Sequence, residues 1–166
     1  MSIEAQKFWD ALKGKGFTFL SGVPDSTFGT SYNVLLKDPG IRYVPAVRED
    51  VALGVASAAR LSGLKGGIVI QNSGIGNIVN GLTSFNLLYK VPVLLVVGWR
   101  GFGGYPNDAP EHWIMGEKTV DFLNLMGIPS RVVEEDTWME DIDKVVSAMA
   151  TDSIPGALLI RSGVLG

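Results

Sequence analysis

The sequence contains no cysteine and a single histidine, His112, among its 166 residues. Without cysteine the chain can form no disulfide, no thiolate metal site and no cysteine nucleophile. Charged residues make up only 19%, and the net charge is −3 with no basic cluster, so nothing favours binding to nucleic acid or to a membrane surface. The longest apolar run, residues 91–99, is too short to span a bilayer. We therefore expect a cytoplasmic protein.

Apolar residues, in contrast, make up 46% of the chain, and strand-like and helix-like patterns alternate along it. Strands are predicted at residues 17–22, 41–47, 66–71, 91–99, 130–134 and 156–162, and helices at 4–13, 25–36, 49–61, 76–89, 113–126 and 138–150. This alternation predicts an α/β fold: a three-layer α/β/α domain with a mainly parallel six-stranded sheet. The length fits one domain, residues 1–166. The apolar excess predicts further burial, under helices on both faces or against a partner.

Four polar loops follow predicted strands, at residues 21–26, 46–50, 71–77 and 98–112. In parallel α/β sheets, ligands bind beyond the carboxyl ends of the strands. These loops hold nearly all the residues whose side chains could take part in binding or catalysis, so we expect a site where the loops meet. Asp25 or Ser26 is also a plausible N-cap of the helix that follows.

Each loop has a simple structural explanation as well. The stretch 71–77 (QNSGIGN) lacks the third small residue of a dinucleotide fingerprint, because Val79 stands there, and an ordinary strand-to-helix turn would explain it. An acid such as Glu49 in the first turn of a helix is favoured by the helix dipole by about 0.3–1 kcal/mol, which would explain Asp50 equally well. A lone histidine is more often structural than catalytic, although His112 lies in a long loop typical of functional sites.

Taken together, four motifs carry a resemblance: GVPDS, PAVREDVALGVASAARLSG, QNSGIGN, and VPVLLVVGWRG followed by DAPEHWIMGEKT. In this order and spacing they resemble the pyrimidine-binding (PYR) domain of thiamine-diphosphate-dependent decarboxylases, in particular sulfopyruvate and phosphonopyruvate decarboxylases. The resemblance runs from about residue 16 to 161. It implies that Glu49 hydrogen-bonds N1′ of the cofactor's aminopyrimidine and so promotes proton removal from thiazolium C2. The small apolar helix behind Glu49 would supply an apolar setting.

The resemblance also implies roles for the other loop residues. The cofactor-binding set is Glu49, Gln71, Asn72, Ser73, Gly74, Gly76 and Asn77, the catalytic set is Glu49 and His112, and the substrate-binding set is Asp25, Ser26, Arg100 and His112. Ser26 and the guanidinium of Arg100 are suited to a tetrahedral oxyanion, although Arg100 would serve equally well in an ion pair. Asp25 is better suited to helix capping or to protonating the intermediate, since it would repel the anion.

One half of such an enzyme is missing from this sequence. The family holds the diphosphate and Mg²⁺ on a second domain with a GDG signature, and no GDG is present here. The resemblance therefore implies a separate subunit without a metal site of its own, working with a beta subunit in a homo-dimer or hetero-oligomer. The implied reaction is the conversion of sulfopyruvate to sulfoacetaldehyde and carbon dioxide. There are two alternatives. The substrate is phosphonopyruvate instead, or the chain is a non-catalytic nucleotide-binding or regulatory module.

Overall fold

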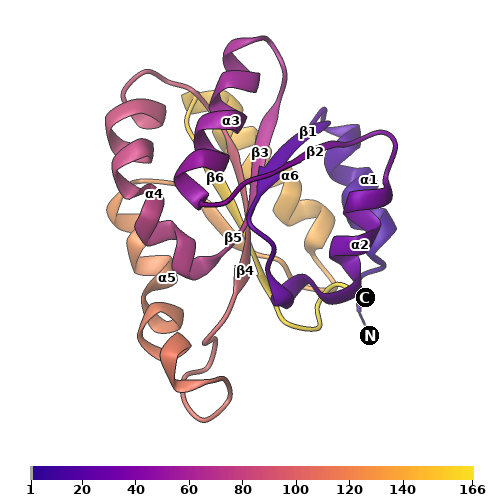
Figure 1. Cartoon of the computed structure of the whole chain (residues 1–166), viewed down its shortest axis with the longest axis vertical. Coiled ribbons are helices and arrows are strands. Elements are labelled where there is room, and N and C mark those ends of the chain that lie inside the picture. The colour runs from indigo at the N-terminus through magenta and orange to yellow at the C-terminus, as the bar shows by residue number, and fades with distance from the viewer. Residues whose placement is uncertain (1) are drawn as a thin grey trace.

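The computed structural model of the protein describes residues 2–166 and contains the predicted alternation of strands and helices (Figure 1). The strands are β1 (Phe19–Gly22), β2 (Arg42–Pro45), β3 (Gly66–Gln71), β4 (Leu94–Trp99), β5 (Ser130–Val132) and β6 (Gly156–Arg161). The helices are α1 (Ala5–Gly14), α2 (Gly29–Lys37), α3 (Glu49–Leu61), α4 (Ile75–Gly81), α5 (Trp113–Leu125) and α6 (Trp138–Asp152). Four short turns complete the order: η1 (Ser26–Phe28), η2 (Asn72–Gly74), η3 (Leu82–Leu87) and η4 (Pro110–His112). No helix within residues 2–166 is both long and apolar enough to cross a membrane.

The six strands form one sheet in the order β2-β1-β3-β4-β6-β5, and every neighbouring pair is parallel. The predicted α/β fold with a parallel six-stranded sheet is confirmed. From β1 the chain first adds β2 on one side and then β3 on the other. In α/β proteins, ligands bind where the strand order reverses in this way, which here is at the carboxyl ends of β1 and β3.

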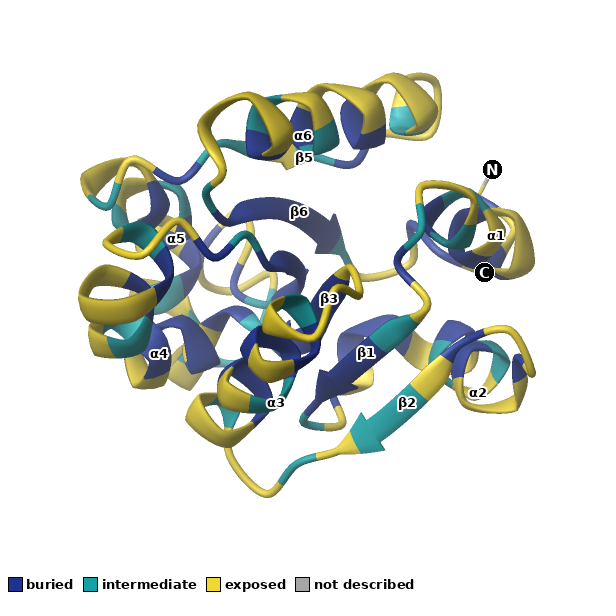
Figure 2. Cartoon of the chain, turned by 90° about the horizontal axis from the view of Figure 1, so that it is seen from above, coloured by how far each residue is buried: buried dark blue, intermediate teal, exposed yellow. Residues whose placement is uncertain are grey.

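Helices cover both faces of the sheet (Figure 2), as the continuous apolar strands require. On one face, side chains of α1, α2 and α6 pack with Val69 and Val96, and Phe8 and Trp9 of α1 are fully buried there. On the other face, α3, α4 and α5 pack with the alternate strand residues, such as Ile68. Every residue of β4 is buried, because this strand lies mid-sheet with both faces covered.

Most predicted elements differ from the structure by one to three residues at an end, and three of the differences have a clear physical reason. The helix predicted at 25–36 is divided into η1 and α2, because Gly29 adopts a φ of +49°, which glycine tolerates best. The helix predicted at 76–89 widens into a π-type turn at η3, where the buried Asn86 bonds Ser57 and the carbonyl of Val91. The strand predicted from residue 91 begins at Leu94, since Pro92 has no N–H to donate to a ladder.

Candidate functional site

Glu49 is the first residue of α3, and its carboxylate lies against the turn that follows β3. Its Oε2 accepts a hydrogen bond of 2.8 Å from Nδ2 of Asn77 in α4. The neighbouring Asp50 is turned away and pairs with Arg48 at 3.1 Å, and this partner lowers the pKa of Asp50. The two acids at the head of the helix therefore differ in role. Asp50 is held by Arg48, and the half-buried Glu49 faces the loop of residues 71–77.

Gly74 is the residue on which the Glu49 side chain rests. A Cβ at this position would lie 2.4 Å from Cγ and 2.9 Å from Oε1 of Glu49, closer than real side chains approach. Gly76, two residues further on, has open space where its Cβ would be. The turn therefore needs a glycine at 74, because any side chain there would displace the Glu49 carboxylate from the backbone. No neighbouring group requires a glycine at 76.

Gln71 and Asp25 meet at the carboxyl ends of the neighbouring strands β3 and β1. Nε2 of Gln71 donates to Oδ1 of Asp25 at 3.0 Å, and the hydroxyl of Ser73 donates to Oε1 of Gln71 at 2.7 Å. Asp25 also accepts from the backbone N–H of Thr27 at 3.3 Å, which confirms its predicted role as a cap. Its other oxygen, Oδ2, is buried beside Gly98 and has no hydrogen-bond partner within residues 2–166.

Asn72 points into the protein and is almost fully buried. Its Nδ2 donates to the carbonyl of Arg100 at 2.9 Å and to Oγ1 of Thr119 at 2.8 Å, and its Oδ1 accepts from the Arg100 N–H at 3.1 Å. The side chain thus ties the end of β3 to the end of β4 and to α5. Any contact of Asn72 with a ligand would have to come from its backbone.

Arg100 forms a two-pronged ion pair with Asp108. Nε and Nη2 donate to the two carboxylate oxygens at 2.7 and 2.6 Å, and Nη1 reaches the hydroxyl of Ser26 at 3.2 Å. The N–H groups of Gly101 and Ala109 also donate to Asp108, each at 2.8 Å. The hydrogen bonds from Arg100, supported by these backbone donors, hold the pKa of Asp108 well below its usual range, and Asp108 in turn raises the pKa of Arg100. Asp108 therefore anchors the loop of residues 100–112.

His112 stands at the far end of the same loop, in η4 directly before α5, and is half-buried. Its carbonyl oxygen packs on Gly101, where a Cβ would lie only 2.1 Å away and where φ is +71°. The backbone at the two ends of the loop is therefore in contact. Within residues 2–166 the imidazole makes no hydrogen bond with the other site residues, so its side chain is free to meet a ligand.

Direct hydrogen bonds thus join the predicted residues other than Gly74, Gly76 and His112 in three sets, all at the carboxyl edge of the sheet. The sets are Glu49 with Asn77, then Asp25 with Gln71 and Ser73, and finally Ser26 with Arg100 and Asn72. Sequence reasoning missed Asp108, Thr119 and Gly98 as parts of the site. Only Asp108 had a signal, an acid inside the long loop eight residues after Arg100.

Comparison with known proteins shows the family of the chain. The family described as "Thiamine pyrophosphate enzyme, N-terminal TPP binding domain" matches residues 5–122. A phosphonopyruvate decarboxylase of Streptomyces viridochromogenes is 33% identical over 158 residues, which are 93% of this chain and 39% of the relative. Another, from Streptomyces hygroscopicus, is 32% identical over 165 residues, or 98% of this chain and 41% of the relative. The alpha subunit of sulfopyruvate decarboxylase from Methanothermobacter thermautotrophicus is 35% identical over 127 residues, 76% of each chain.

The chain spans about two fifths of the length of the phosphonopyruvate decarboxylases that it matches. The family match covers most of the helices and strands and includes every loop of the site just described. The chain therefore belongs to the thiamine pyrophosphate enzyme family, in which it is a pyrimidine-binding domain related to phosphonopyruvate and sulfopyruvate decarboxylases.

Proposed function

We propose that the chain is the PYR subunit of a thiamine-diphosphate-dependent decarboxylase that converts sulfopyruvate to sulfoacetaldehyde and carbon dioxide. The observation that carries this proposal is the position of Glu49. Its carboxylate lies on the backbone of Gly74 and is oriented by Asn77 at 2.8 Å, at the carboxyl edge of the sheet. The family match and the decarboxylase relatives support the proposal.

The residues present fit the aminopyrimidine half of thiamine diphosphate. Oε2 of Glu49 is engaged by Asn77, whereas Oε1 accepts no hydrogen bond within residues 2–166 and so remains available to a ring nitrogen. The Glu49 side chain fills the space beside Gly74, whereas the turn is open at Gly76, where nothing lies within 4 Å of an added Cβ, and a flat heterocycle could approach the backbone there. The bound cofactor would supply the electron sink for the loss of carbon dioxide. Glu49 would hold a proton at N1′, and Gly76 and Asn77 would complete the wall of the site.

The substrate end of the proposed site lies at the other loops. Ser26 and Nη1 of Arg100 are 3.2 Å apart and would together donate to a sulfonate oxygen. Two of the three nitrogens of Arg100 are already held by Asp108, so its orientation is fixed before substrate arrives. His112 would donate to the anion or return a proton after decarboxylation. Asp25, held by Gln71, would sit beside the reacting carbon as an acid rather than as an anion receptor.

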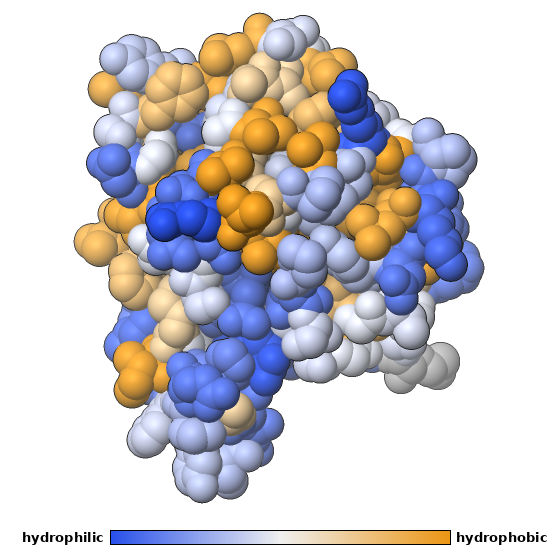
Figure 3. All heavy atoms as spheres, viewed as in Figure 1, coloured by the Kyte–Doolittle hydropathy of each residue, from blue (hydrophilic) through white to orange (hydrophobic). Residues whose placement is uncertain are grey.

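A partner chain would complete this site by binding the diphosphate and Mg²⁺, and we propose a beta subunit in that role. The assembly would be a hetero-oligomer, in which this chain could also form a dimer with itself. Apolar side chains next to Glu49 support this arrangement, since Val47 is 88% exposed and Val51 is 46% exposed. Leu88, after η3, is 64% exposed on the same side of the sheet. Apolar residues gather over α3 and beside it in Figure 3, and such patches are typical of interfaces. The description "subunit alpha" of the sulfopyruvate relatives agrees with a separate subunit.

Phosphonopyruvate is the second candidate substrate. The phosphonopyruvate decarboxylases match 93% and 98% of this chain, against 76% for the sulfopyruvate relative. Both substrates carry a tetrahedral anion on the methyl group of pyruvate, and Ser26 with Arg100 suits either one.

The test is co-expression with a GDG-containing partner chain, followed by measurement of carbon dioxide release from sulfopyruvate, phosphonopyruvate and pyruvate with thiamine diphosphate and Mg²⁺. We expect activity only from the assembled enzyme, with sulfopyruvate preferred. A preference for phosphonopyruvate would assign the second substrate. A stable complex that releases no carbon dioxide from any of the three would overturn the proposed function and leave a non-catalytic module.

A further inference from the structure

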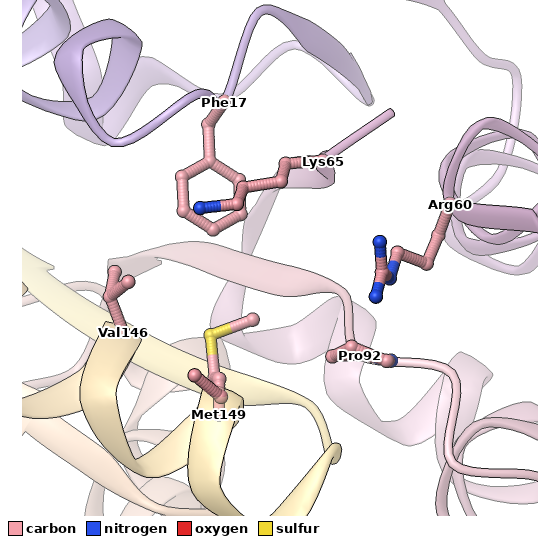
Figure 4. Close-up of a pocket in the computed structure, with 7 residues that line it drawn as sticks. Phe17, Arg60, Lys65, Pro92, Val146 and Met149 are labelled. Atoms are coloured by element: carbon pink, nitrogen blue, oxygen red, sulfur yellow. The ribbon is translucent and has the colours of Figure 1, made fainter. Parts of the chain in front are cut away.

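A cavity lies at the amino edge of the sheet, opposite the edge that carries Glu49 (Figure 4). Its apolar lining comes from Phe17 before β1, Pro92 before β4, and α6. The residues of α6 that line it are Val146, Met149 and Ala150. Its volume is about 110 Å³, below the roughly 300–1,000 Å³ of sites for drug-sized ligands, so the cavity suits only a small or slender ligand. None of the residues named for the proposed decarboxylation contributes to this cavity.

Two cations stand at its rim, and no acid is among its lining residues. Lys65 lies across the ring of Phe17, with Nζ 5.9 Å from the ring centre, and donates to the carbonyl of Lys15 at 2.8 Å. Arg60 reaches from the last turn of α3 toward Pro92 and is half-buried. Its guanidinium has no hydrogen bond or ion pair within residues 2–166. Of the two cations, Arg60 is therefore the one whose N–H groups are available to bind an anion.

The lining selects the chemistry of a ligand. A hydrocarbon chain would displace water from the apolar floor, and a carboxylate would take the two parallel N–H donors of Arg60. Lys65 would add positive charge without a direct contact, since its ammonium already bonds the Lys15 carbonyl. Small dianions such as the proposed substrates lack an apolar body and would leave the floor exposed. We propose that this cavity binds a medium-chain monocarboxylate, with the carboxylate on Arg60 and the chain between Phe17 and α6.

The place of this cavity in the fold suits an effector. Helix α3 begins with Glu49 and carries Arg60 in its last turn, eleven residues later. At about 1.5 Å per residue, the two side chains are attached about 16 Å apart on one rigid element. A ligand held by Arg60 would thus contact the same helix that positions the Glu49 carboxylate, without entering the site at the other edge of the sheet.

Calorimetry on the whole chain with butanoate, hexanoate, octanoate and octanol tests this site and needs no partner subunit. Each added methylene buried in the cavity should tighten binding about fourfold, and octanol should bind more weakly than octanoate. Arg60→Gln should weaken octanoate binding about tenfold, as the loss of a charge-assisted hydrogen bond predicts. Ala150→Phe should block the cavity; residue 150 is exposed on α6, so this change should leave the fold intact.

Arg42→Gln is the matched control, because Arg42 also lies over a phenyl ring, 5.8 Å from the centre of Phe19, but outside the cavity. This variant should bind octanoate like the original chain. Circular dichroism would establish that all three variants are folded. The proposal would be overturned if Arg60→Gln and Ala150→Phe bound octanoate as tightly as the original chain does. It would also be overturned if the original chain showed no saturable binding at millimolar octanoate. The result is independent of the decarboxylase activity, so each proposal can fail without the other.

Discussion

Replacing Gly74 with alanine would place a methyl group inside the Glu49 side chain. The added Cβ would lie 2.4 Å from Cγ, 2.8 Å from Cδ and 2.9 Å from Oε1 of Glu49. Ordinary contacts between carbon atoms are about 3.5–4.0 Å, so Cγ of Glu49 would have to retreat by about 1 Å or more. Gly74 has a φ of −66°, which alanine adopts without strain, so the backbone itself does not resist the change.

The consequence should fall on catalysis rather than on folding. Glu49 is half-buried and flexible enough to move aside, so the free energy of unfolding should change by less than about 1 kcal/mol. A displacement of about 1 Å at a catalytic carboxylate, however, costs about 100-fold in rate. We therefore expect Gly74→Ala to lower turnover of the assembled enzyme by about 100-fold.

Gly14→Ala provides the matched control, because nothing lies within 4 Å of the Cβ that it would add and Gly14, in α1, lies outside the site. That variant should keep full turnover and a free energy of unfolding at least equal to that of the original chain, since alanine has the better helix propensity. Turnover is measured by carbon dioxide release from sulfopyruvate, and stability by urea unfolding of the chain alone. Equal turnover in the two variants would refute the placement of Glu49 on the turn.

Three further results are expected from the site. Gln71→Leu removes the donor on Asp25, so turnover at saturating cofactor should fall about tenfold, and this loss should vanish in an Asp25→Asn background; a loss of the same size in both backgrounds, measured by steady-state kinetics, would contradict a role of Gln71 through Asp25. His112→Ala and Ser26→Ala should impair turnover of sulfopyruvate much more than that of pyruvate, and equal losses would move the substrate pocket to the partner chain. Asp108→Asn should lower the free energy of unfolding by about 1–3 kcal/mol at pH 7. Since the folded state lowers the pKa of Asp108, its stabilisation is present above an unfolded pKa of about 3.9 and is lost progressively below it; urea unfolding that shows the same difference at pH 7 and pH 3 would disprove this.

The layers of the fold followed from the sequence because local patterns determine them. The bounds predicted for α3 and β3 coincide with those observed, since each has a clear start signal and an uninterrupted periodicity. The prediction that the polar loops meet at one edge of the sheet is also confirmed, because parallel strands bring their carboxyl ends together.

The pairing of individual side chains could not be predicted in this way. Gln71 bonds Asp25 because β1 and β3 are neighbours in the sheet, although β2 lies between them along the chain. Asn72 turns inward because Thr119 and the Arg100 backbone offer it partners, and the sequence pattern of a glycine turn says nothing of that direction. Such contacts depend on which strands are adjacent and on the direction of each side chain.

We propose Glu49 as the carboxylate that serves the aminopyrimidine of thiamine diphosphate. The direct measurement is the turnover of sulfopyruvate by assembled enzyme containing Glu49→Gln, compared at saturating thiamine diphosphate with the unaltered enzyme. Glutamine keeps the size and the hydrogen-bonding capacity of the side chain but cannot deliver the proton, so turnover should fall at least about 100-fold. Stability should hardly change, because one acid in a first helical turn contributes less than about 1 kcal/mol. Glu49→Gln enzyme that retains most of its turnover would contradict the assignment.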